Sequence, residues 1–102
     1  MSLPMPWKTR DVYLELRRYA KKKQVASYSQ IASKVGLANQ SVRLPLYYIW
    51  GFCHGRGIPH ISAIAVNKQT KMPAQGYPVE RAHLVQEQQR VFGHKWPANL
   101  LD

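Results

Sequence analysis

The sequence predicts one mainly helical α+β domain, in which a helix-turn-helix is followed by a small β wing. The chain has 102 residues, which is close to the commonest size of a single domain. Apolar residues recur at helical spacing in several segments, whereas one apolar run rich in β-branched residues has the length of a strand. A two-turn helix, a glycine turn and a longer helix follow one another, which is typical of a helix-turn-helix.

The first helix is expected over about residues 10–23, after an irregular arm over residues 1–8. Thr9 is expected to cap this helix, and Asp11 lies in its first turn, where the helix dipole favours an anion. The expected buried stripe recurs every three or four residues and consists of Val12, Leu16, Tyr19 and Ala20, with Tyr13 beside it.

Two further helices are expected around a tight turn. Ser27 and Gln30 have the spacing of a capping box, which predicts a helix over about 28–35 that ends at Gly36. The next helix is expected over about 40–54, capped by Asn39 or Ser41. The second half of that helix is apolar almost all round, so we expect its aromatic residues in the core rather than on a stacking surface: Tyr47, Tyr48, Trp50 and Phe52.

The wing is expected after these helices. Residues 61–66 are rich in β-branched side chains and predict a strand, and residues 67–71 form a polar, basic turn. A short second strand is expected over 72–78, weakened by Pro73 and Gly76. The last helix is expected over about 80–92 and ends at Gly93, and residues 94–102 form a tail that Trp96 would pin.

Composition indicates the class of partner. Fifteen Lys and Arg residues against five Asp and Glu residues give a net charge of +10, which favours nucleic acid first and an anionic membrane surface second. Cys53 is the single cysteine, which excludes an intramolecular disulfide and a zinc site of clustered cysteines. His60, His83 and His94 have neither metal-ligand spacing nor a carboxylate partner, so no metal or cofactor is expected. With neither a long apolar run nor a signal-like N-terminus, the expectation is a soluble, cytoplasmic protein.

In a helix-turn-helix, the N-terminal residues of the longer helix contact bases in the major groove, while flanking groups hold phosphates. The predicted base-contacting residues are Asn39, Gln40, Ser41 and Arg43, because Asn and Gln bind adenine and Arg binds guanine. The predicted phosphate contacts are the helix N-terminus and three lysines: Ser27, Tyr28, Ser29, Lys34, Lys68 and Lys71. The alternative is that Asn39 and Ser41 only cap the helix and that Arg43 is a solvated surface residue.

Several of these residues also form a longer pattern. The segment Ser27-Tyr28-Ser29-Gln30-Ile31-Ala32, followed by Gly36 and Ser41-Val42, resembles the Ser-Tyr-x-x-Ile-Ala…Gly…Arg-Ala-Val pattern of alkylguanine-DNA alkyltransferases and alkyltransferase-like proteins. Residues 61–67 stand where that family has Pro-Cys-His-Arg-Val-Val-Asn, and residues 76–84 are similar to its Gly-Tyr and following helix. The resemblance covers about residues 10–92 and implies a winged-helix DNA-binding domain.

The chain departs from that family where alkyl transfer takes place. Ser62 and Ala63 align with the acceptor cysteine and its histidine, and a serine without a base is a poor nucleophile. Gln40 aligns with the arginine that the family inserts into the duplex, whereas Tyr28 matches the tyrosine that helps to displace a nucleotide. The resemblance therefore implies DNA binding without transfer chemistry. The alternatives are a sensor of alkylated bases, an enzyme that uses Cys53, and a protein-interaction module.

Overall fold

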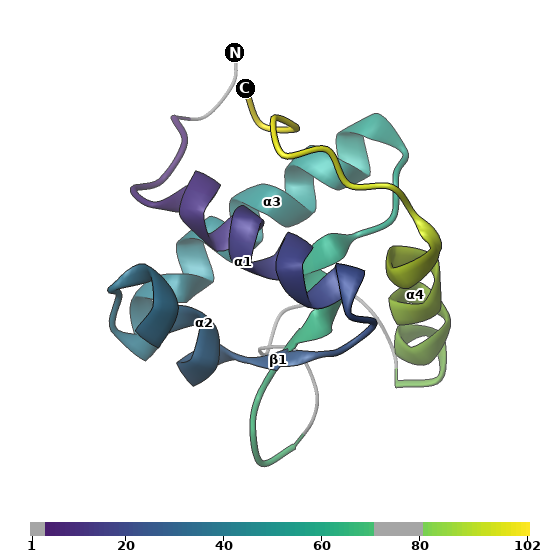
Figure 1. Ribbon diagram of the computed structural model, residues 1–102, viewed down its shortest axis with the longest axis horizontal. Coiled ribbons are helices and arrows are strands. Elements are labelled where there is room, and N and C mark those ends of the chain that lie inside the picture. The colour runs from purple at the N-terminus through teal and green to yellow at the C-terminus, as the bar shows by residue number, and fades with distance from the viewer. Residues whose placement is uncertain (1–3, 71–80) are drawn as a thin grey trace.

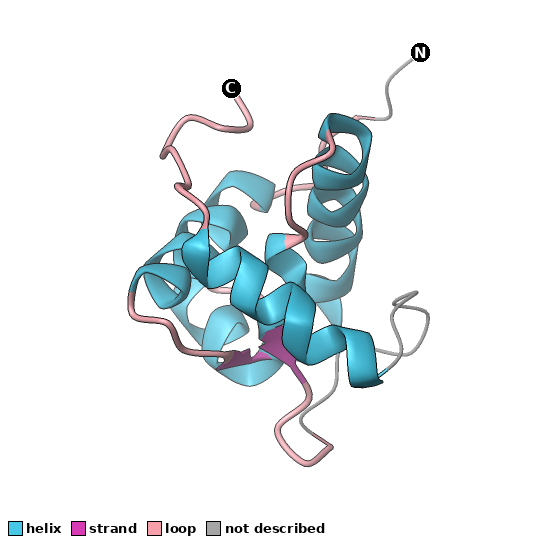
Figure 2. Cartoon of the chain, turned by 90° about the vertical axis from the view of Figure 1, so that its right-hand side faces the viewer, coloured by secondary structure: helices cyan, strands magenta, loops and turns pink. Residues whose placement is uncertain are grey.

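The computed structural model describes residues 4–70 and 81–102 and is mainly helical, with a small two-stranded parallel sheet (Figures 1 and 2). The described α-helices are α1 (Thr9–Lys21), α2 (Tyr28–Val35), α3 (Arg43–Arg56) and α4 (Arg81–Gly93). Two 3-10 helices, η1 (Asn39–Val42) and η2 (Ile61–Ile64), precede α3 and β2 respectively. The strands are β1 (Ala26–Ser27) and β2 (Ala65–Val66). The predicted second strand over 72–78 and Lys71 lie outside the described residues.

The core of the protein lies along one face of α1, which packs against α2, α3 and η2. The predicted stripe of α1 is buried, with Tyr13 fully inside and Tyr19 half-buried. Burial raises the pKa of Tyr13 to about 12, so its phenol stays protonated and donates a 2.6 Å hydrogen bond to the Pro97 carbonyl. The prediction that Thr9 caps α1 is wrong, because the N-cap residue is Lys8, with a φ of 65°. The Thr9 hydroxyl instead donates a hydrogen bond to the carbonyl of Pro6, which precedes the helix.

Helix α2 has the predicted bounds and the predicted capping box. The Ser27 Oγ accepts from the Gln30 amide at 3.1 Å, and the Gln30 Oε1 accepts from the Ser27 amide at 2.9 Å. Gly36 ends the helix with a φ of 77°, in the left-handed region that favours glycine. The Lys8 ammonium donates to the Val35 carbonyl at 2.7 Å and so satisfies an acceptor at the C-terminal end of α2.

The predicted helix over 40–54 is divided in the structure. Residues 39–42 form η1, α3 begins at Arg43, and neither Asn39 nor Ser41 caps with its side chain, which corrects that prediction. Pro45 therefore lies in the first turn of α3, where its missing N–H would have had no partner.

One apolar stripe of η1 and α3 faces the core and consists of Val42, Leu46, Ile49 and Cys53. The prediction that Tyr47 belongs to the core is wrong, because it lies off this stripe and is 70% exposed. Tyr48, Trp50 and Phe52 are half-buried at the edges of the stripe.

The predicted strand over 61–66 is wrong for its first four residues. Ile61–Ile64 form η2 with all four residues buried, and the two residues after them pair with β1, in the parallel register Ala26↔Ala65 and Ser27↔Val66. A short apolar run fits a buried helical turn as well as a strand, because its periodicity does not distinguish the two.

The tail after α4 folds back onto α1, and Trp96 pins it as predicted. Trp96 is 5% exposed, its indole donates to the Val91 carbonyl at 2.9 Å, and its own carbonyl accepts from the Arg17 Nε at 2.6 Å. Within the described ranges, no helix combines the length and the apolarity that crossing a membrane requires.

Candidate nucleic-acid interface

A shallow cavity of about 330 Å³ lies where the N-terminal end of α2 meets the turn after β2. It brings together three of the residues predicted to bind phosphate, Ser27, Ser29 and Lys68. The other lining residues are Val25, Gln30 and Val66. Among the described residues, the cavity is therefore lined by hydroxyl and amide groups, one cation and apolar side chains, and by no carboxylate.

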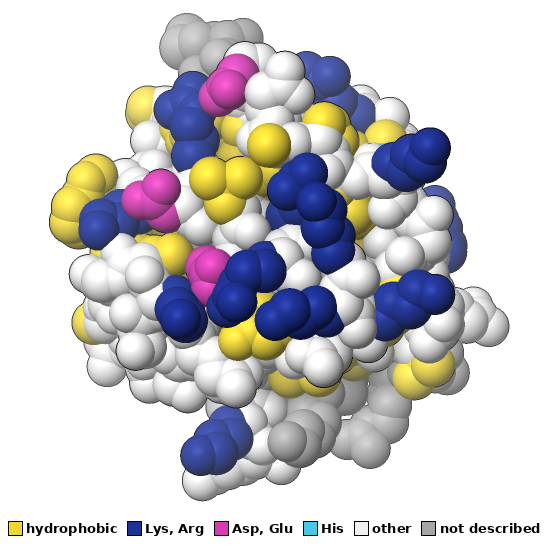
Figure 3. Space-filling view, viewed as in Figure 1, with side chains coloured by type: hydrophobic (Ala, Val, Ile, Leu, Met, Phe, Trp, Pro, Cys, Tyr) yellow, Lys and Arg dark blue, Asp and Glu magenta, His cyan; other side chains and the backbone are white. Residues whose placement is uncertain are grey.

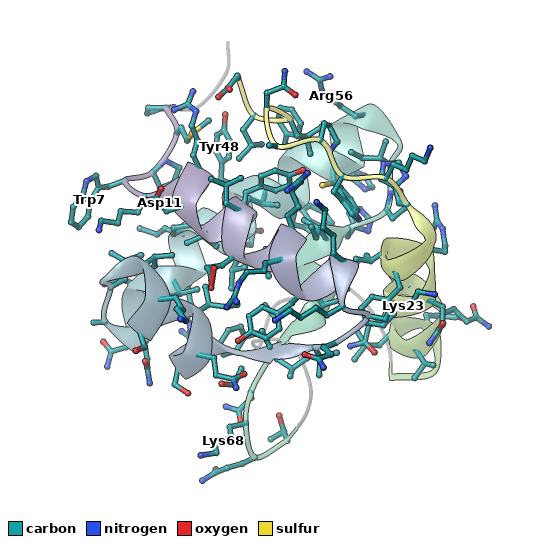
Figure 4. All side chains as sticks on the ribbon, viewed as in Figure 1. Trp7, Asp11, Lys23, Tyr48, Arg56 and Lys68 are labelled. Carbon is teal, nitrogen blue, oxygen red and sulfur yellow. The ribbon has the colours of Figure 1, made fainter. Side chains whose placement is uncertain are left out.

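The parallel pairing of the two strands creates this site. Because Ser27 is in register with Val66, the turn over 67–70 begins beside the first residues of α2. The Asn67 Oδ1 accepts from the amides of Gln69 at 2.8 Å and Thr70 at 3.2 Å, which fixes the turn. Lys68, which follows Asn67 in this turn, projects at the lower edge of the molecule (Figure 4).

The electrostatics of the cavity favour an anion. The N-terminal end of a helix carries partial positive charge, and α2 has no acidic residue in its first turn to neutralise it. The Ser27 and Ser29 hydroxyls form a 3.1 Å hydrogen bond with each other, which leaves one hydroxyl proton of the pair to donate to a bound group. Lys68 is exposed and adds a full positive charge.

The residues predicted to contact bases are on the surface. Asn39, Gln40, Ser41 and Arg43 are all exposed, on η1 and at the start of α3. Since α2 packs against η1, the helix that carries the cavity also supports this face.

Two exposed apolar side chains lie on the same part of α3: Tyr47, which was expected in the core, and Leu44, for which no position was predicted. Leu44 is 69% exposed and Tyr47 is 70% exposed. A signal for them was available, because the buried spacing 42, 46, 49 and 53 places positions 44 and 47 on the opposite side of the helix.

The remaining predicted phosphate contacts are less closely grouped. Tyr28 is half-buried and packs against the core, and Lys34 is exposed near the C-terminal end of α2, outside the cavity lining. Lys71 lies outside the described residues.

The two candidate nucleophiles are inside the protein. Ser62 is 3% exposed, and its Oγ is buried without a hydrogen-bond partner among the described residues. Cys53 is fully buried, and burial raises the pKa of its thiol to about 11. A thiol with that pKa is protonated at neutral pH, and the thiolate is the nucleophilic form.

A stacked cluster joins α3 to α4, and it corrects one prediction. His60 has a carboxylate partner after all, because its Nδ1 lies 3.4 Å from the Glu87 Oε2. The rings of Trp50, His54 and His60 stack on one another with centroids 4.9–5.5 Å apart. Burial lowers the pKa of His60, against the opposing effect of Glu87. His54 is exposed, and Trp50 and His60 are half-buried.

Comparison of the chain with protein-family models, curated proteins and solved structures gives no match.

Proposed function

We propose that the protein binds double-stranded DNA without catalysing a reaction, using α2, η1 and α3 as a helix-turn-helix. The observation that carries the proposal is the cavity that gathers Ser27, Ser29 and Lys68 on the helix that supports the exposed residues of η1 and α3. The net charge of +10 supports a polyanionic partner, and the resemblance described above supports DNA.

In this proposal the cavity holds a phosphate of the DNA backbone. The phosphate oxygens accept from the hydrogen-bonded pair of Ser27 and Ser29 hydroxyls, through the proton that their mutual bond leaves free, and from the N-terminal end of α2. Lys68 supplies charge from the turn after β2. Lys34 contacts a second phosphate near the other end of the same helix. These contacts fix the register of the protein on the duplex and read no sequence.

Sequence is read by the exposed face of η1 and α3. Gln40 and Arg43 carry the side chains suited to adenine and guanine edges, and Asn39 and Ser41 lie beside them. Leu44 and Tyr47 add apolar surface to the same part of α3, which suits contact with thymine methyl groups.

The burial of both nucleophiles supports binding rather than catalysis. An acceptor must reach the base that it attacks, whereas Ser62 is 3% exposed and Cys53 is fully enclosed. A sensor of alkylated bases needs no acceptor, and what weighs against it is Gln40, which stands where the resembled family inserts an arginine. Equal affinity for plain and alkylguanine-containing duplexes is therefore expected, and a clear preference for the alkylated duplex would instead support the sensor.

The test is selection from a pool of randomised duplexes, followed by affinity measurements on the selected duplex. The variant Gln40→Ala with Arg43→Ala is expected to lose at least about tenfold in affinity, since one good base contact contributes about 1–3 kcal/mol. The control is Gln89→Ala with Arg90→Ala, which removes the same two residue types from exposed positions of α4.

The control variant is expected to bind within about twofold of the unmodified protein, because α4 lies across the molecule from α2 (Figure 1). Equal loss in both variants would reduce the interaction to bulk charge. No loss in the first variant would contradict the proposal and favour a protein-interaction module.

A further inference from the structure

A second pocket, of about 360 Å³, lies between the C-terminal half of α1, the end of α4 and the tail. We call it the tail pocket. It is lined by three cations, Arg17, Lys21 and Lys95, and by the rings of Phe92, His94 and Trp96. It shares no lining residue with the cavity beside Lys68, and the proposed DNA interface makes no use of it.

The walls of the tail pocket are held in place by hydrogen bonds and packing. The Arg17 Nε donates to the Trp96 carbonyl at 2.6 Å, and the Trp96 indole donates to the Val91 carbonyl at 2.9 Å. The His94 ring packs edge-on against Trp96 with a centroid distance of 4.5 Å. Only the Nε of Arg17 is engaged among the described groups, so its two terminal nitrogens remain available as donors.

The positive charge of the tail pocket is not neutralised by the described residues. Three of the described acidic side chains pair elsewhere, Asp102 with Arg10, Glu15 with Arg18, and Glu87 with His60 and Arg90. The fourth, Asp11, lies in the first turn of α1, at the other end of that helix from the pocket. None of the lining residues that the structure describes is acidic. Figure 3 shows Lys and Arg side chains gathered over the region where Figure 1 places the C-terminal half of α1 and α4.

Helix stability explains part of this charge and not the rest. A lysine in the last turn of α1, such as Lys21, interacts favourably with the negative end of the helix dipole. Lys95 belongs to the tail, and Arg17 donates to a carbonyl of the tail. The helix dipole of α1 therefore does not explain why three cations line the tail pocket. Bringing like charges together is unfavourable unless an anion binds between them.

We propose that the tail pocket binds a phosphate group. Phosphate carries the charge and the several acceptor oxygens that a guanidinium and two ammonium groups would satisfy, and the adjoining rings offer apolar contact to whatever carries the phosphate. The phosphate comes either from a free phosphorylated molecule or from a nucleic-acid strand, since both present the same group.

The test is a titration of the full chain with inorganic pyrophosphate, in which NMR amide chemical shifts are monitored. The salt concentration is about 150 mM, so that nonspecific attraction to the charged surface is screened. Saturable shifts are expected at residues 17–21 and 92–96. The variant Lys21→Gln with Lys95→Gln is expected to weaken binding at least about tenfold, as the loss of charge-assisted hydrogen bonds implies. The control Lys22→Gln with Lys23→Gln removes the same charge from exposed residues outside the lining. Its affinity for pyrophosphate is expected to fall by less than about twofold.

Unsaturable shifts spread over the basic surface, or equal weakening in both variants, would overturn the proposal. A duplex titrated onto the pyrophosphate complex then separates the two sources. Displacement of pyrophosphate assigns the pocket to a nucleic-acid strand, and simultaneous binding assigns it to a free phosphorylated molecule. Failure of the DNA-binding proposal leaves this test intact, because its readout is the pyrophosphate titration.

Discussion

Two glycines in this chain, Gly36 and Gly51, have opposite roles. Gly36 ends α2 at a φ of 77°, where a side chain is strained by its own backbone. Gly51 lies within α3, and a Cβ built there meets nothing within 4 Å. The first glycine is therefore required by the turn between α2 and η1, whereas the described part of the chain gives no structural reason for the second.

This contrast predicts stability changes of opposite sign. Gly36→Ala is expected to lower the free energy of unfolding by about 1–2 kcal/mol, because alanine disfavours the left-handed region. Gly51→Ala is expected to raise it by up to about 1 kcal/mol, because alanine favours a helix over glycine. Urea unfolding of both variants tests the prediction, and a stabilising Gly36→Ala would contradict the turn geometry.

Cys53 is predicted to be unreactive in the folded protein. It is fully buried and the pKa of its thiol is about 11, so at about pH 8 it is both inaccessible and protonated. A thiol-specific chromogenic reagent should modify it slowly in buffer and rapidly after unfolding in guanidinium, which serves as the control. Modification of the folded protein at the rate of a free thiol would reopen the possibility of an enzyme that uses Cys53.

At the scale of elements, the tail contributes to the core of the domain. Trp96 packs edge-on against Tyr13 with ring centroids 6.4 Å apart, and its backbone and indole both form hydrogen bonds. Trp96→Ala is expected to cost about 3–5 kcal/mol of the free energy of unfolding. Trp7→Ala is the matched control, because Trp7 is 75% exposed and contacts Lys8 at the surface. This substitution is expected to lower the free energy of unfolding by less than about 1 kcal/mol. Thermal or urea unfolding measures both, and equal losses would mean that the tail is not anchored.

His60, in the cluster between α3 and α4, is predicted to make the stability of the fold sensitive to acid. The pKa of His60 is lowered from its ordinary value of 6.5, so near and below that pH the unfolded chain binds the proton more readily than the folded one. Stability is therefore complete above that range and falls as the pH drops through it. The cluster around His60 contains Glu87, His54, Arg90 and Trp50.

The measurement is the melting temperature between about pH 7.5 and pH 5.5. His60→Gln should reduce the fall that the unmodified protein shows over this interval, whereas His83→Gln, at an exposed position of α4, should leave it unchanged. The same fall in all three proteins would show that another group controls the acid response.

Elements with local signals were predictable, and those that depend on distant partners were not. The capping box of Ser27 and Gln30 and the stop at Gly36 are local, so the bounds of α2 followed from the sequence. The division of residues 61–66 into η2 and β2 depends on pairing with Ala26 and Ser27, far away in the chain. The pairing of His60 with Glu87 is likewise created by tertiary packing between segments distant in sequence.

At the scale of the whole molecule, the net charge could be predicted from composition. Which charged residues come together in the folded protein could not. The predicted phosphate residues Ser27, Ser29 and Lys68 meet because a parallel strand pair brings two segments together. The tail pocket had no local signal either, since its cations come from α1 and from the tail. Leu44 and Tyr47 could have been found, because the spacing of the buried residues of η1 and α3 already places them outside.

The most direct test of the account is the salt dependence of binding to a duplex of about 20 base pairs, measured by fluorescence anisotropy. We expect the logarithm of the binding constant to fall linearly and steeply with the logarithm of salt, because each neutralised phosphate releases counterions. Lys68→Gln should make the slope shallower by about one, the change expected from losing a single phosphate contact. A duplex that does not bind even at low salt would contradict the central claim.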